Sequence, residues 1–136
     1  MTAQDNKELI RHIMEDGFNK QDMSVVYDSF HTDYVRHGHG VAGMGSLGEH
    51  VEDLKARHAA FDGARFTILK IVGDGDTVAV QFDFTGIHSG TFNGLPATGN
   101  QVKRPAAAFF VIRDGKVAEG TVFADGAGFM AQLQKS

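Results

Sequence analysis

The first half of the chain places its apolar residues at the three-to-four-residue spacing of helices. Between Asp5 and Asn19 charged residues separate the apolar positions, which are Leu9, Ile10, Ile13, Met14 and Phe18. This spacing predicts an amphipathic helix over residues 5–19. We expect two further helices, over residues 23–30 and about 46–61, with a short extended segment at residues 33–40 between them.

From Ala64 onward the pattern changes to runs rich in Val, Ile and Phe, separated by Gly and Asp. These runs predict strands at residues 65–72, 77–88 and 101–113. Asp114-Gly115 joins the last of these to a further strand, because this dipeptide favours the type I′ turn of a β-hairpin. A short helix over residues 126–134 follows. Helices before antiparallel strands predict a single α+β domain, residues 1–136, with helices on one face of a sheet.

The strand at residues 105–112 is apolar on both of its faces. Ala107, Phe109 and Val111 alternate with the opposite set, Ala106, Ala108, Phe110 and Ile112. One face can pack against the helices, but the other also needs protection from water. We therefore expect a homodimer that pairs this sheet face with its copy in a second subunit.

Composition and charge narrow the function classes. The 136 residues contain no cysteine, which excludes a disulfide framework and a cysteine nucleophile and makes a cytoplasmic location the default expectation. The net charge of −4 and the scattered Lys and Arg argue against nucleic-acid binding. The chain has no apolar run of membrane length and no signal-peptide pattern, so we expect no membrane partner.

Asp125 ends the last predicted strand and has two interpretations. Strict alternation places it on one face with Val117, Glu119, Thr121 and Phe123, so that it would be an acid beside apolar side chains. Such an acid has a raised pKa and can exchange protons near neutral pH. Asp is also a preferred N-cap residue, and the predicted terminal helix begins at the next position. The pattern leaves both interpretations open.

The remaining polar residues have plainer explanations. His37 and His39 offer two imidazoles without a third ligand, so we expect no metal site. His58 lies on the apolar stripe of its helix, while His12, His31 and His50 have the pattern of surface residues. Asp83 faces away from Asp125 by alternation, which argues against an Asp83, Arg104 and Asp125 set for epoxide hydrolysis. Arg104 is a candidate ion-pair partner for Asp83.

The order of elements and several short segments resemble the SnoaL-like polyketide cyclase family over almost the whole chain. These segments are Tyr34-Val-Arg-His37, Thr85-Gly-Ile-His88-Ser-Gly-Thr-Phe-Asn-Gly, Thr98-Gly-Asn-Gln-Val and Arg113-Asp-Gly-Lys-Val-Ala-Glu119. The resemblance implies the cone-shaped α+β fold shared with ketosteroid isomerase and nuclear transport factor. In that fold a curved, mostly antiparallel sheet wraps on about three N-terminal helices and encloses an apolar pocket.

The resemblance also implies a site and a function. Asp125 matches the catalytic carboxylate of the family, and His37 and His88 match polar positions near the pocket mouth. The residues that we expect to line the pocket are Tyr27, Phe30, Leu54, His58, Phe61, Phe82, Phe84, Phe109, Thr121 and Phe123. The expected function is cofactor-independent acid/base catalysis, by aldol cyclisation, isomerisation or dehydration, on an apolar carbonyl or polyketide-like molecule. The alternative is a non-catalytic small-molecule-binding or dimeric scaffold protein of the same fold.

Overall fold

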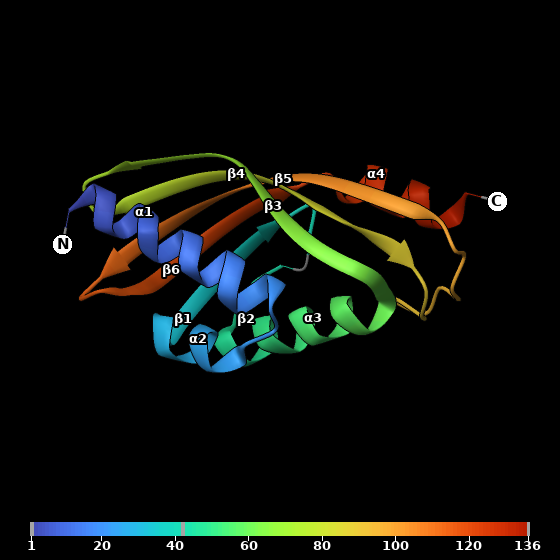
Figure 1. Ribbon diagram of the computed structural model, residues 1–136, viewed down its shortest axis with the longest axis horizontal. Coiled ribbons are helices and arrows are strands. Elements are labelled where there is room, and N and C mark those ends of the chain that lie inside the picture. Colours follow the sequence, from blue (N-terminus) through green and yellow to red (C-terminus); the bar gives the residue numbers. More distant parts are fainter. Residues whose placement is uncertain (1, 42, 136) are drawn as a thin grey trace.

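Six strands form one curved sheet, and the helices of the N-terminal half lie against its concave face (Figure 1). The computed structural model describes residues 2–41 and 43–135. In chain order its elements are α1 (Ala3–His12), η1 (Ile13–Asn19), α2 (Met23–Ser29), β1 (Phe30–His39), β2 (Gly45–Ser46), α3 (Leu47–Ala60), β3 (Phe61–Asp74), β4 (Thr77–His88), β5 (Gln101–Arg113), β6 (Lys116–Ala124) and α4 (Gly126–Gln134). The architecture is α+β, as the sequence predicts.

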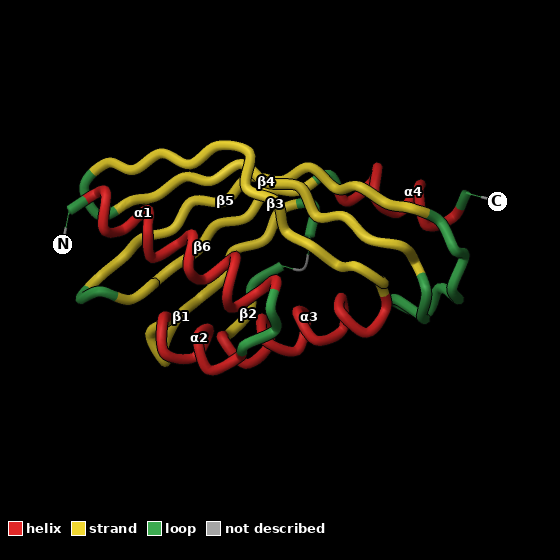
Figure 2. Tube along the Cα trace, in the orientation of Figure 1, coloured by secondary structure: helices red, strands yellow, loops and turns green. Residues whose placement is uncertain are grey.

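The strand order in the sheet is β2-β1-β6-β5-β4-β3. Strands β1 and β6 run parallel, while the other neighbouring pairs are antiparallel. The predicted hairpin between β5 and β6 is confirmed, because Asp114 and Gly115 both have positive φ, 53° and 75°. Figure 2 shows the strands curling around the helices, with α4 at the end of the molecule opposite the N-terminus.

Side-chain caps fix where the helices begin. Thr2 and Asp5 form a capping box at the start of α1, and Ser46 and Glu49 form another at the start of α3. Asp22 caps α2 through the backbone N–H of Ser24. The α3 cap is important for the site described below, because α3 carries several of its side chains.

The cone closes because α3 contacts both β1 and β3, which lie toward opposite edges of the sheet. Asn19 ties η1 to β3 through two hydrogen bonds with the backbone of Phe66, at 2.9 and 2.7 Å. Apolar side chains from the helices and from the concave face of the sheet form one continuous core. No helix in the described part of the chain is both long and apolar enough to cross a membrane.

Candidate functional site

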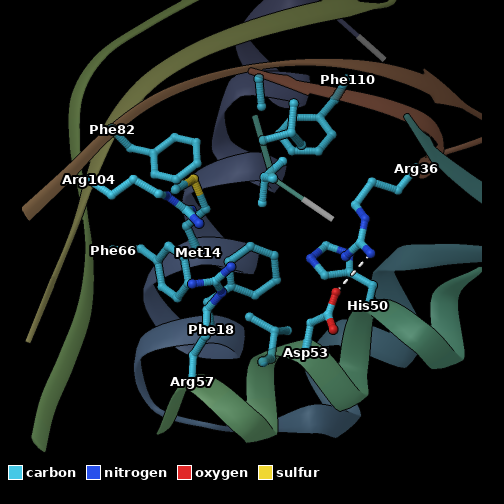
Figure 3. Close-up of a pocket in the computed structure, with 14 residues that line it drawn as sticks. Met14, Phe18, Arg36, His50, Asp53, Arg57, Phe66, Phe82, Arg104 and Phe110 are labelled. Carbon is cyan, nitrogen blue, oxygen red and sulfur yellow. Dashed lines mark ion pairs between the residues drawn. The ribbon is translucent and has the colours of Figure 1, made fainter. Parts of the chain in front are cut away.

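A cavity lies inside the cone, between α3 and the concave face of the sheet (Figure 3). Its apolar walls include Phe18 of η1, Phe66 of β3, Phe82 of β4 and Phe110 of β5. Its volume is about 60 Å³, well below the roughly 300–1,000 Å³ of clefts that hold drug-sized ligands. A ligand larger than a few atoms must therefore displace side chains that now fill the space.

An ion pair joins β1 to α3 beside this cavity. Nη2 of Arg36 lies 2.8 Å from Oδ2 of Asp53, and both residues line the cavity. The Arg36 side chain is 8% exposed, whereas that of Asp53 is 41% exposed. A Cβ at Gly45 would come within 3.0 Å of the same Arg36 nitrogen, so the glycine leaves room for the guanidinium. The carboxylate thus stands between the interior and solvent, held by a buried cation.

His50 of α3 also lines the cavity, next to that pair (Figure 3). Its ring is stacked on Tyr34 and lies edge-on to Phe18 and Phe30. Burial, and then the nearby charges of Arg36 and Arg57, lower the pKa of His50 to about 3. The imidazole is therefore neutral at physiological pH, with one nitrogen that donates and one that accepts. Its Nδ1 is buried without a hydrogen-bond partner in the described residues.

Two further guanidinium groups reach the cavity, from Arg57 of α3 and Arg104 of β5 (Figure 3). Burial lowers the pKa of Arg57 to about 10, and burial together with the charge of Arg57 lowers the pKa of Arg104 to about 9. Both groups still carry a positive charge at pH 7. The site thus combines three cations, one carboxylate and a neutral imidazole within apolar walls.

This arrangement suits proton transfer and the stabilisation of negative charge. A carboxylate can accept a proton, and guanidinium groups in a region of low dielectric constant can stabilise an oxyanion that forms nearby. Among residues 2–41 and 43–135, no group of three or more His, Asp or Glu side chains is placed to hold a metal ion.

The structure places Asp125 outside this cavity. Asp125 is exposed at the start of α4, where its Oδ1 accepts a hydrogen bond from the backbone N–H of Gly128 at 2.9 Å. The helix-capping interpretation of Asp125 is therefore confirmed. Its acid/base role stays a prediction, without the apolar surroundings on which that prediction depended.

His37 and His88, the other two residues predicted as catalytic, lie neither at the cavity nor beside Asp125. Nε2 of His37 is 3.3 Å from Oε1 of Glu119, in a solvent-accessible contact between β1 and β6. His88 is fully buried at the end of β4, where its Nδ1 is 3.0 Å from the hydroxyl of Thr98 and its ring stacks on Phe61. The three residues are therefore not brought together.

The predicted pocket lining is only partly correct. Leu54 and Phe82 line the cavity, and Phe30, Phe61 and Phe84 lie in the core around it. His58 does not face the cavity, because its Nε2 is hydrogen-bonded to the backbone oxygen of Phe18 at 2.7 Å. Thr121 is half-buried on β6. The prediction is wrong for the three most exposed residues of the set, which are Tyr27 (51%), Phe109 (47%) and Phe123 (46%).

A β-bulge explains the error at β6. The register between β5 and β6 shifts so that Ala118 has no partner between Val117 and Glu119. One extra residue in a strand turns every following side chain to the opposite face. Val117 is buried as expected, but Phe123 then lies on the convex side instead of sharing its face, and Asp125 follows the end of the strand as the cap of α4.

The residues of the cavity that sequence reasoning missed did leave signals. Arg104 has the same parity on β5 as Ala106, Ala108 and Phe110, and a charged residue on an apolar face is unusual. It does not pair with Asp83, because Arg104 is opposite Phe84 in the sheet and shares its face, whereas Asp83 lies on the other face. Lys103 is 3.6 Å from Asp83 instead.

On α3, the missed residues are His50, Asp53 and Arg57. His50 and Arg57 lie four residues before and three after Leu54, within the helical spacing of the apolar stripe. Because His50 lines the cavity and packs against aromatic rings, its assignment to the surface is wrong. Asp53 has no such signal, since it becomes part of the site only through Arg36 on a distant strand.

A comparison with known protein families identifies one family. The sequence profile of SnoaL-like polyketide cyclases matches residues 8–133. No curated protein sequence matches the chain. Among solved structures, a candidate SnoaL-like polyketide cyclase from Jannaschia sp. CCS1 is 22% identical, covers 98% of this chain and 94% of its own, and has a TM-score of 0.87.

Two Streptomyces structures are similar to the same extent. IdmH from Streptomyces antibioticus, a candidate polyketide cyclase, is 25% identical over 96% of this chain and 99% of its own, with a TM-score of 0.83. AclR from Streptomyces galilaeus, a candidate hydroxylase, is 22% identical over 99% of this chain and 88% of its own, with a TM-score of 0.87. The similar structures thus carry more than one proposed chemistry.

Proposed function

Because the chain belongs to the SnoaL-like polyketide cyclase family, we propose that it is a cofactor-independent acid/base enzyme. Its substrate is an apolar carbonyl compound of polyketide type, and the reaction is an aldol cyclisation, an isomerisation or a dehydration. All three reactions can begin with removal of a proton next to a carbonyl group, followed by use of the resulting enolate. The proposal differs from the sequence-based expectation in the residue that takes the proton.

The position of Asp53 carries this proposal. Among the described residues that line the cavity, Asp53 is the only carboxylate. Its partial exposure gives a substrate access to it, while Arg36 at 2.8 Å fixes its orientation. A carboxylate is a weak base compared with the enolate of a simple ketone, which favours a substrate whose proton is already acidic. A carbon between two carbonyl groups, as in a polyketide chain, carries such a proton.

The neighbouring groups suit the product of that step. An enolate oxygen that forms in the cavity beside Asp53 lies near the guanidinium group of Arg36, and a preorganised cation stabilises such charge. The neutral imidazole of His50 can donate a hydrogen bond without competing for the proton. Apolar walls exclude water and so strengthen each of these interactions.

A proton-exchange experiment tests the proposal. The probe is ethyl benzoylacetate, an uncharged molecule with a CH₂ group between two carbonyls, dissolved in D₂O at mildly acidic pD. Proton NMR then follows the loss of the CH₂ signal above the buffer background. We expect Asp53→Asn to lower the catalysed rate by about 10²- to 10⁴-fold, the usual contribution of a positioned acid or base.

Asp125→Asn is the matched control, because it makes the same change at the carboxylate that the sequence predicts as catalytic. We expect it to keep the wild-type rate. Loss of exchange in Asp125→Asn with a normal rate in Asp53→Asn would return the acid/base role to Asp125. Failure of the wild type to exceed the buffer background would instead favour the binding or scaffold alternative.

The homodimer remains part of the proposal. Phe109 and Phe123 are nearly half exposed on the convex face, and their rings meet edge to face at 6.4 Å. Val72, 54% exposed, pairs with Ala79, whose neighbour on β5 is Phe109. These side chains form a continuous apolar strip across the sheet, and a second copy of the same face can cover it.

A further inference from the structure

Arg57 and Arg104 lie between two cavities. Both residues line the cavity described above, and both also line a second one of about 180 Å³ beside α4. The walls of this second cavity include Phe92, Phe129 and Gly126. The two long side chains therefore form much of the partition between the cavities. If they moved aside, one larger space would result.

The two guanidinium groups share the same aromatic surroundings. The Cζ of Arg57 is 5.3 Å from the ring centres of Phe84 and Phe92 and 5.9 Å from that of Phe129. The Cζ of Arg104 is 5.7 Å from the centres of Phe84 and Phe129. Contact with two common rings brings two like charges close together in a largely buried region.

Neither group has a carboxylate partner within the described part of the chain. Nη1 of Arg57 and Nε of Arg104 are buried and have no hydrogen-bond acceptor among the described residues. Arg104 as a whole is only 4% exposed, and neither arginine forms an ion pair with any of the described residues. The one carboxylate of the first cavity, Asp53, is taken by Arg36. Aromatic faces attract a cation, but they do not accept the N–H groups that lie in the guanidinium plane.

A buried cation without a hydrogen-bond acceptor is costly, so this arrangement favours the binding of an anion. The planar edge of a guanidinium fits a carboxylate, which it binds through two parallel hydrogen bonds. A carboxylate also carries a single charge and is easier to bring into apolar surroundings than a phosphate dianion. The aromatic walls of the first cavity accept an apolar molecular body next to that charge.

We propose that Arg57 and Arg104 bind a carboxylate group of the substrate, whose apolar body occupies the cavity walled by Phe18, Phe66, Phe82 and Phe110. This inference names the substrate class of the proposed enzyme, a carbonyl compound with a carboxylate, and to that extent rests on the proposed function. Binding draws both guanidinium groups toward the anion. It thereby opens the partition and joins the first cavity to the second, which enlarges the space open to the apolar body.

Binding is tested without turnover, using benzoate and its neutral isostere benzamide. Thermal unfolding and isothermal titration calorimetry are run on the wild type and on Arg104→Met, which keeps an unbranched, flexible side chain but removes its charge. Arg113→Met is the control, because Arg113 is exposed on the same strand. Arg57→Met makes the equivalent change from α3 and serves if Arg104→Met does not fold.

We expect benzoate to raise the unfolding temperature of the wild type and of Arg113→Met, with at least a tenfold preference over benzamide. Arg104→Met should lose at least tenfold in benzoate affinity. Without ligand it should unfold at a higher temperature than the wild type, because an unpaired buried charge has been removed. A purely structural arginine would give the opposite change in unfolding temperature.

Equal affinity of the wild type for benzoate and benzamide would overturn the inference, as would wild-type benzoate affinity in both Arg104→Met and Arg57→Met. The outcome is independent of the proton-exchange experiment, whose probe is uncharged. Exchange without benzoate binding would refute the carboxylate site alone. Benzoate binding without exchange would refute the proposed catalysis alone.

Discussion

On the concave face of the sheet, Arg104 of β5 is buried beside Phe84 and Phe129, and its Nε has no acceptor in the described residues. On the convex face of the same strand, Phe109 is 47% exposed to solvent. The inner face thus holds charge where apolar atoms are expected, and the outer face holds apolar surface where polar atoms are expected. Alternation along one strand separates the two by a few residues.

The difference favours a different kind of partner for each face. Charge inside a cone can be matched only by something small enough to enter it, which favours a ligand. Apolar surface on an open, gently curved face can be matched by another surface of similar shape, which favours a second subunit. The two features therefore make separate predictions, and changes at one face should leave the other intact.

The largest expected effect is on stability, when a phenylalanine of the concave face and one of the convex face are each replaced by alanine. Phe84 is fully buried and packs against Phe61 and Phe66. Phe84→Ala should lower the free energy of unfolding by about 3–5 kcal/mol, the usual cost of such a cavity. Phe109→Ala should change it by less than about 0.5 kcal/mol at a concentration where the protein is monomeric. Urea unfolding of both variants measures the two values, and similar losses would remove the contrast between the faces.

A charge on the convex face should act on association. We expect Phe109→Glu to weaken the proposed homodimer by about 100-fold, or roughly 2.7 kcal/mol, because two carboxylates would be buried at its two-fold interface. Analytical ultracentrifugation over a range of concentrations measures the dissociation constant. Tyr27→Glu is the control, since Tyr27 is a similarly exposed aromatic residue on α2 (51%). A stable dimer would have a dissociation constant on the order of 1 µM or below. A wild type that stays monomeric at about 100 µM, roughly a hundred times that value, would therefore contradict the predicted homodimer.

Most of the fold could be predicted from sequence because its signals are local. The bounds of β4, β5 and α4 agree with the predicted ranges, since Gly-rich turns, the Asp114-Gly115 pair and a capping aspartate mark their ends. The parallel pairing of β1 with β6 and the two-residue strand β2 were not predicted. Both depend on segments that meet only after the chain has folded.

The site could be predicted much less well, for two physical reasons. The bulge at Ala118 reverses the face of the following residues, and nothing in the alternation of β6 reveals it. The charged residues of the cavity come from β1, α3 and β5, and each is a common surface type when considered alone. Only their convergence in space makes them a site.

A smaller effect should appear in the pH dependence of stability, through His50 on the concave side. Its pKa is lowered to about 3 in the folded protein, against about 6.5 in the unfolded chain. Between these values the unfolded state binds one more proton, so stability is lost as the pH falls. For one group the slope is about 1.4 kcal/mol per pH unit.

His50→Gln should remove that slope between about pH 4 and 6, a range that lies between the two pKa values. It should leave the dissociation constant of the proposed dimer unchanged. Urea unfolding at several pH values measures the free energy of unfolding and hence the slope. His12→Gln, at an exposed histidine on α1, is the matched control. An equal change of slope in both variants would show that His50 is not the group responsible.

The smallest expected effect concerns Asp125, which belongs to neither face because its side chain caps α4. Asp125→Ala removes the acceptor for the Gly128 N–H and should lower the free energy of unfolding by about 1 kcal/mol. Asp125→Asn should be close to wild type, because asparagine caps a helix about as well as aspartate. Both variants should bind benzoate normally, since Asp125 lines neither cavity next to Arg57 and Arg104. If Asp125→Ala were as stable as the wild type yet lost proton exchange, the side chain would have to leave its cap and act on the substrate, and the division of roles between Asp53 and Asp125 would be reversed.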